Sequence, residues 1–167
     1  MQVLEVRNVH DALVRGMDLL HTEDFRNESR NGRVYQARTP VTTVYERPKE
    51  RVLFWEERDA NPFFHFMESL WMLDGRNDLE FVKYYAKNME NYSDDGKILW
   101  GAYGWRWRYY FGFDQLKVII ERLKKDGEDR RSVLQMWDAY NDLGRDGKDV
   151  PCNTSIYFKE DTTGCLH

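Results

Sequence analysis

Cys152 is the residue of this sequence best suited to covalent chemistry. It follows Pro151, after a flexible loop and at the opening of a predicted strand, where a rigid neighbour can hold an exposed thiol in one orientation. A cysteine becomes a strong nucleophile when a nearby cation such as arginine stabilises its thiolate. The alternative is a small buried residue on a strand, which is the usual role of an isolated cysteine.

Glu68 is a carboxylate at an apolar position of a predicted helix. At helical spacing it shares a face with Phe64, Trp71 and Met72. A carboxylate on such a face is costly to bury unless it is paired or used, and burial raises its pKa into a range that suits proton transfer near neutral pH. A structural ion pair with an arginine is the competing explanation.

Arginine is over-represented among the cationic residues, with 16 Arg against 9 Lys, although the net charge is −4. This balance argues against a nucleic-acid-binding surface and fits a few focused anion pockets better, although the count alone favours simple compositional bias. Arg130 and Arg131 open a predicted strand, so one can face a pocket and the other an interface. Arg30 lies in a glycine-containing loop that could bind phosphate. A solvated pair at a turn is the commoner role for adjacent arginines.

An aromatic block spans Trp100 to Phe113 and holds three Trp, three Tyr and two Phe. Such rings could stack on a flat heteroaromatic ligand, although most of them are expected in the core or in an interface. The sequence contains no phosphate-binding glycine loop of the P-loop kind, no dinucleotide fingerprint and no Cys/His set with zinc spacing.

The length of 167 residues and the 41% apolar content predict one folded domain over residues 1–167. No stretch is long and apolar enough for a membrane span, the first residues do not resemble a signal peptide, and two cysteines are too few for a disulfide framework. These features predict a cytoplasmic protein with no membrane and no DNA or RNA partner.

The elements that must position these residues follow from apolar spacing and capping. Asn61 and Pro62 predict the start of the clearest helix, and Gly75 predicts its end. Further helices are expected at 9–20, 78–89 and 114–126, strands at 33–38, 41–46, 51–55, 132–137 and 152–158, and loops at 22–32, 91–97 and 138–149. Helices and strands without regular βαβ alternation predict an α+β fold.

Five short motifs in order resemble the thymidylate synthase superfamily, which includes the deoxycytidylate and deoxyuridylate hydroxymethylases. The motifs are Arg30-Asn31-Gly32, the segment from Phe66 to Gly75 with Glu68 and Trp71, Tyr103-Gly104 with Trp107-Arg108, Arg130-Arg131 with Trp137-Asp138, and Pro151-Cys152. The resemblance runs from about residue 22 to the last residue. It implies a mixed β-sheet flanked by helices, with one sheet face forming the interface of a homodimer.

The activity that this resemblance implies is one-carbon transfer from 5,10-methylenetetrahydrofolate to C5 of a pyrimidine nucleoside monophosphate. Cys152 would attack C6 of the ring, Glu68 would handle protons and organise water, and Tyr103 would lie near C5. Arg130 and Arg131 would reach the partner's nucleotide phosphate across the dimer, and Arg30 would be a phosphate-loop arginine. Asn153 and Trp71 would contact the substrate. No metal is implied.

Two features depart from the pattern of typical thymidylate synthases. Asn153 follows Cys152 where those enzymes carry His, and the segment from Arg58 to His65 also resembles the hydroxymethylases more closely. Both favour the hydroxymethylase branch of the family, in which water captures an exocyclic methylene intermediate on the pyrimidine and the folate returns as tetrahydrofolate.

The resemblance implies that family members continue for roughly another hundred residues beyond this point, which is more than a typical small-domain increment. The C-terminal portion of the fold, with the residues that choose uracil or cytosine, is therefore expected to be absent. A catalytically incomplete remnant that only dimerises or packs against another chain remains an alternative. An anion-binding structural module in which Cys152 is merely core is a third.

Overall fold

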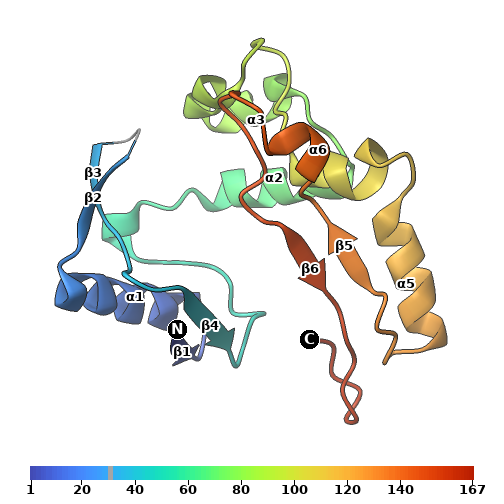
Figure 1. Ribbon diagram of the computed structural model, residues 1–167, viewed down its shortest axis with the longest axis horizontal. Helices are drawn as coiled ribbons and strands as arrows, with labels where there is room; N and C mark the ends of the chain where they lie inside the picture. The colour runs from blue at the N-terminus through green and yellow to red at the C-terminus, as the bar shows by residue number, and fades with distance from the viewer. Residues whose placement is uncertain (30–31) are drawn as a thin grey trace. The chain divides into compact units, whose positions relative to one another are not determined.

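The computed structural model describes residues 1–29 and 32–167, and they divide into two compact units, Met1–Pro62 and Phe63–His167 (Figure 1). No helix among the described residues is long and apolar enough to cross a membrane. That residues 1–167 form one domain stays a prediction.

The first unit combines one long helix with two small pairs of strands. Asn8 caps the helix by accepting hydrogen bonds from the backbone N–H groups of His10 and Asp11, at 3.0 and 3.2 Å. β1 and β4 pair in parallel, and β2 and β3 pair antiparallel. The elements are β1 (Gln2–Val6), α1 (Val9–Glu23), β2 (Arg26–Ser29), β3 (Gly32–Tyr35), β4 (Val41–Tyr45) and η1 (Glu56–Arg58).

Two sequence predictions for the first unit are wrong. The expected loop at 22–32 contains the end of α1 and all of β2. The residues of β2 are polar and exposed and form a strand because they pair with β3, so the pattern of apolar residues does not reveal this strand. Residues 51–55 were expected to form a strand, and the structure gives them no strand. Their β-branched and aromatic content is a weak preference that no neighbouring strand satisfies there.

The second unit places helices around one antiparallel pair of strands, β5 and β6 (Figure 1). The elements are α2 (Pro62–Leu73), α3 (Leu79–Tyr85), η2 (Lys87–Tyr92), α4 (Tyr103–Trp105), the π-helix η3 (Arg106–Tyr110), α5 (Gln115–Lys125), β5 (Val133–Gln135), α6 (Ala139–Asp142) and β6 (Ser155–Tyr157). The expected helix 78–89 ends at Tyr85 and continues as η2. The expected loop 138–149 contains α6, which Asp138 caps.

Helix α2 begins and ends where the sequence predicts. Pro62 occupies its first position, where a missing N–H group has no cost. Gly75 has a φ of +73°. The Gly75 N–H group donates to the carbonyl oxygen of Met72 at 3.0 Å, and the Arg76 N–H group donates to the carbonyl oxygen of Trp71 at 3.1 Å. This pair of bonds is the Schellman ending that glycine favours.

Two buried clusters form the core of the described part of the second unit. The first contains Trp71, Leu79, Val82, Leu99 and Ala102. The second contains Ile119 of α5, Leu134 of β5 and Met136. Tyr103 packs against the second cluster, and Trp105 packs against the first, so the start of the aromatic block lies between the two.

The close approach of α2 and α4 depends on Gly104. A Cβ atom at this position would lie 2.0 Å from the carbonyl oxygen of Met72. Only glycine fits there. The contact fixes Tyr103, the first residue of α4, beside α2.

The α+β class is confirmed, with both parallel and antiparallel strand pairs. The described strands are held as three separate two-stranded sheets, whereas one mixed sheet flanked by helices was expected. One face of the β5–β6 pair buries Leu134, while Val133 and Tyr157 on the other face are 44% and 47% exposed. The edges and this outer face remain available for pairing or packing.

Candidate active site

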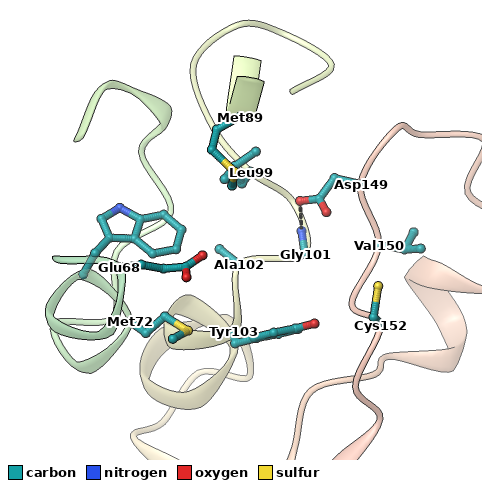
Figure 2. A pocket seen from close by; sticks show the side chains of 11 residues that line it. Glu68, Met72, Met89, Leu99, Gly101, Ala102, Tyr103, Asp149, Val150 and Cys152 are labelled. Carbon is teal, nitrogen blue, oxygen red and sulfur yellow. Dashed lines mark hydrogen bonds between the residues drawn. The ribbon is translucent and has the colours of Figure 1, made fainter. Parts of the chain in front are cut away.

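A cavity of about 170 Å³ in the second unit brings together Glu68, Tyr103 and Cys152 (Figure 2). Its walls come from α2, from the segment 99–103 and from the segment 149–152. The three residues are distant in sequence, so the fold, not local chain geometry, assembles them. The remaining lining residues are Trp71, Met72, Met89, Leu99, Gly101, Ala102, Asp149 and Val150.

Glu68 lies half-buried on α2 and lines the cavity. Burial raises the pKa of its carboxyl group, and the nearby His65 opposes this shift only in part. No arginine pairs with Glu68 within the described part of the chain, so the alternative of a structural ion pair finds no support there. The expectation that the apolar face of this helix raises the pKa of Glu68 is confirmed.

Tyr103 is half-buried, and its hydroxyl group points toward Cys152 (Figure 2). Burial raises the pKa of the Tyr103 phenol, and the charge of a Cys152 thiolate raises it further, while backbone N–H groups of Asn153 and Cys152 act in the opposite direction. The phenol therefore keeps its proton at neutral pH. It can donate a hydrogen bond to an anion at the thiol.

Cys152 is exposed, forms no disulfide and lies in a bend three residues before β6. The sequence placed it at the opening of a strand, but the strand begins only at Ser155. The preceding Pro151 is buried, and Asn153 is exposed. A proline fixed in the core thus carries a thiol that remains accessible.

Trp71 belongs to the core and also forms a wall of the cavity. The residue is 4% exposed, and its Nε1–H group lies 3.2 Å from the backbone oxygen of Asp78 and 3.3 Å from Oδ1 of the same residue. The indole can offer a bound molecule an apolar surface, because its polar atom is already satisfied.

The predicted phosphate-binding arginines do not line this cavity. Arg130 and Arg131 are exposed in the turn before β5, and the structure corrects their assignment to the strand itself. Asp129 holds the turn by accepting the backbone N–H group of Arg131 at 3.0 Å. Arg30 lies outside the described residues. Among the described residues that line the cavity none is an arginine or a lysine, so the described lining offers no such cation to a thiolate at Cys152.

Asp149 lines the cavity but was not singled out by the sequence. Its Oδ2 atom accepts the backbone N–H group of Gly101 at 2.7 Å (Figure 2). Burial raises the pKa of Asp149, although this hydrogen bond and the more distant Arg106 lower it in part. Its position three residues before Cys152 was the signal that could have placed Asp149 at the site. An acidic residue in a polar loop is normally expected to be exposed to solvent.

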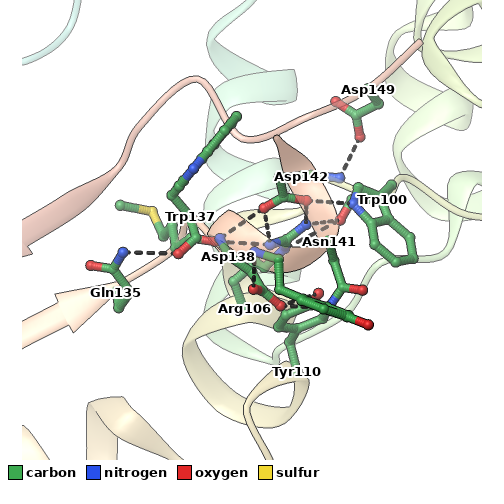
Figure 3. Close-up of polar contacts among 12 residues, drawn as sticks. Trp100, Arg106, Tyr110, Gln135, Trp137, Asp138, Asn141, Asp142 and Asp149 are labelled. Atoms are coloured by element: carbon green, nitrogen blue, oxygen red, sulfur yellow. Dashed lines mark hydrogen bonds and ion pairs between the residues drawn. The ribbon is translucent and has the colours of Figure 1, made fainter. Parts of the chain in front are cut away.

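Arg106 and Asp142 form the other feature that the sequence did not reveal (Figure 3). Neither side chain is exposed, and two hydrogen bonds of 2.7 and 2.9 Å join them. Asp142 also accepts the Trp100 Nε1–H group and the Asp138 backbone N–H group, each at 2.8 Å. The Arg106 guanidinium lies 4.1 Å from the centre of the Tyr110 ring.

Within the described residues no group of three or more His, Cys, Asp or Glu side chains is arranged to hold a metal ion.

Comparison with known proteins assigns this arrangement to a family. The sequence model described as thymidylate synthase matches residues 22–167. The chain belongs to the thymidylate synthase family. The match includes Glu68, Tyr103 and Cys152, and membership of the thymidylate synthase family agrees with the resemblance that the ordered motifs indicate.

Two phage proteins named deoxyuridylate hydroxymethyltransferase are relatives within the thymidylate synthase family. The protein of Pseudomonas phage M6 is 58% identical over 159 residues, which cover 95% of this chain and 45% of that protein. The protein of Bacillus phage SP01 is 37% identical over 131 residues, which cover 72% of this chain and 34% of that protein. This chain thus spans less than half the length of these relatives. The solved structure of the thymidylate synthase of phage T4 is 24% identical, with a TM-score of 0.49. The match covers 60% of this chain and 41% of that chain.

Proposed function

We propose that this chain takes part in hydroxymethyl transfer to C5 of deoxyuridylate. The observation that carries the proposal is the meeting of Cys152, Tyr103 and Glu68 in one cavity. The names of the two phage relatives favour a uracil ring and a hydroxymethyl product. Asn153, in place of the histidine expected in a synthase, favours the same product.

In the proposed mechanism the Cys152 thiolate forms a bond to C6 of the pyrimidine. The electron pair of the C5–C6 double bond moves toward the C4 carbonyl, so C5 becomes a carbon nucleophile. When bound, 5,10-methylenetetrahydrofolate would supply the carbon that C5 attacks and would return as tetrahydrofolate. Transfer of the C5 proton to water and breakage of the bond between the new carbon and the folate nitrogen would leave an exocyclic methylene group on the ring.

Water completes the reaction by adding to that methylene group. Glu68, whose pKa is raised by burial, takes a proton from the attacking water. The electron pair returns through C5, and the bond between C6 and the Cys152 sulfur breaks. The neutral Tyr103 phenol donates a hydrogen bond at the thiol, which stabilises the sulfur as an anion when it attacks and when it leaves.

The walls of the cavity suit a flat heteroaromatic molecule. Trp71, Met72 and Leu99 provide apolar surface, while Glu68 provides an acceptor for N–H groups. We propose that the pyrimidine lies beside Cys152 and Asn153, and that the ring system of the folate packs against Trp71.

Phosphate binding is proposed to involve a second copy of the chain. Arg130 and Arg131 are exposed and outside the cavity, and they lie in the turn before β5, whose pair with β6 exposes Val133 and Tyr157. A homodimer through this face would bury apolar area and let both arginines reach the partner's nucleotide. Arg30 is proposed as a further phosphate ligand. A cytoplasmic location also stays a prediction.

Tritium release tests the proposed function. The chain is incubated with deoxyuridylate labelled at C5 and with 5,10-methylenetetrahydrofolate, and the product is analysed by mass. We expect release of tritium and a hydroxymethyl product, without formation of dihydrofolate. Tritium release and the product should both be lost in Cys152→Ser and kept in Cys165→Ser. Dihydrofolate with a methylated product would assign the synthase reaction instead. No release would favour the incomplete remnant.

A further inference from the structure

Asp149 joins the segment that carries Cys152 to the opposite wall of the cavity. Its Oδ2 atom accepts the Gly101 N–H group at 2.7 Å, and Gly101 is buried. Gly101 lies two residues before Tyr103, and Asp149 lies three residues before Cys152. One hydrogen bond therefore connects the backbone that carries the thiol with the backbone that carries the phenol (Figure 2).

The two segments also touch along their backbones. A Cβ atom at Gly101 would lie 2.8 Å from the carbonyl carbon of Val150 and 2.9 Å from the nitrogen of Pro151. Backbone atoms cannot move aside as a flexible side chain can, so a larger residue would push the segments apart. The contact requires glycine on one side and the Asp149 hydrogen bond holds it closed.

Other carboxylates hold the loop upstream of Asp149, and Asp149 makes the hydrogen bond that reaches the segment carrying Tyr103. Asp142 is buried against Arg106, and Asp94 binds Arg145 at 2.7 Å and the backbone N–H group of Lys148 at 2.9 Å. These bonds fix the loop upstream of Asp149. None of them reaches the segment from Gly101 to Tyr103.

We propose that Asp149 is a positioning residue that holds Cys152 against Tyr103 through its hydrogen bond to the Gly101 N–H group. It acts on the thiol through the backbone, without touching the substrate. The inference deepens the proposed function, since the position of Cys152 matters most if that thiol is the nucleophile. A carboxylate that accepts a backbone N–H group makes a stronger bond than a neutral acceptor does.

The first test is an NMR titration of the unmodified chain. The amide resonance of Gly101 is expected to shift with the ionisation of Asp149, with a midpoint above the ordinary aspartate range because burial raises this pKa. Asp94, Arg106, Arg145 and the cavity residue Glu68 are the other charged groups near it. The titration should vanish in Asp149→Asn. A Gly101 amide that does not titrate, or that titrates unchanged in Asp149→Asn, would overturn the proposal.

The second test measures alkylation of Cys152 relative to Cys165, a readout that needs no catalytic turnover. We expect Asp149→Ala to reduce the preference for Cys152 several-fold, and Asp149→Asn to restore most of it, because an amide oxygen still accepts the Gly101 N–H group. Gly101→Ala should reduce the preference in the same way. Asp146→Ala, an exposed aspartate of the same loop, is the matched control and should change nothing.

The outcomes separate the two proposals. An unchanged preference in Asp149→Ala, or an Asp149→Asn variant that behaves like Asp149→Ala, would overturn the positioning role. A normal Gly101 titration together with no tritium release would instead leave the positioning role intact and contradict the proposed function.

Discussion

Arg106 and Asp142 form a doubly hydrogen-bonded ion pair from which solvent is excluded on both sides. Burial by itself would raise the pKa of Asp142, but hydrogen bonds from Arg106, the Asp138 amide and Trp100 outweigh it and the net pKa is lowered. The pair connects η3, which follows Tyr103, with α6, which opens the loop to Cys152. Its integrity therefore affects both halves of the candidate site.

Arg106→Met should destabilise the chain strongly. Removing one partner leaves the other charge buried without compensation, which costs on the order of 3–5 kcal/mol. Urea unfolding at neutral pH measures this loss. The control is Arg15→Met, which removes a 3.2 Å pair with Asp11 whose arginine is 53% exposed, and it should cost about 0.3–0.5 kcal/mol. Equal losses in the two variants would contradict the structural role given to Arg106.

Cys152 should react with a mild alkylating reagent before Cys165. Both thiols are exposed, but only Cys152 lies at the cavity beside the Tyr103 hydroxyl group. Mass mapping after brief labelling gives the two rates. Deoxyuridylate should protect Cys152 and leave Cys165 unaffected. Equal labelling that the nucleotide does not change would remove the support for a preformed site.

Arg130→Ala should weaken nucleotide binding more than Lys124→Ala. A charge-assisted bond from arginine to phosphate contributes about 1.5–3 kcal/mol, whereas Lys124 lies in the last turn of α5, where it complements the helix dipole. Calorimetry with deoxyuridylate measures both. Because Arg130 lies outside the cavity of its own chain, the effect should appear only where sedimentation shows a dimer. Equal effects would make the assignment of Arg130 wrong.

Glu68→Gln should stabilise the chain more at neutral pH than at acidic pH. Burial raises the folded-state pKa of Glu68 above the unfolded value of about 4.3. The stability that its protonated form contributes is complete below the unfolded pKa and is lost as the pH rises through the folded pKa. Glutamine keeps the neutral form at every pH. Thermal unfolding at pH 4 and pH 7 tests the sign.

The control for that comparison is Glu121→Gln, which removes a carboxylate from an exposed position of α5. A Glu68→Gln variant whose relative stability falls as the pH rises would contradict the burial of the charged carboxylate.

The sequence predicted those parts of the fold that local rules determine. The limits of α2 follow from Pro62 and Gly75, and the position of Glu68 in the cavity wall follows from helical spacing. Tyr103 was placed near the site only through the family resemblance. Nothing in the local pattern indicates that it lies beside Cys152, because the two residues are brought together by contacts made between distant segments.

What could not be predicted depends on pairing between distant residues. The partner of Arg106 lies 36 residues away, and an arginine between two tryptophans gives no local sign that it is fully buried. β2 is composed of polar residues and exists because β3 pairs with it, whereas residues 51–55 have strand-forming side chains and no partner. Strand formation reflects context more than intrinsic preference.

Trapping the covalent adduct tests most directly whether Cys152 is the nucleophile. In 5-fluorodeoxyuridylate the C5 position carries no proton to lose, so an adduct formed at C6 with methylenetetrahydrofolate present cannot proceed to product. We predict that digestion and mass spectrometry find the nucleotide on the peptide that contains Cys152, and that Cys152→Ser abolishes it. Nucleotide attached to Cys165, or an adduct that persists in Cys152→Ser, would contradict the account.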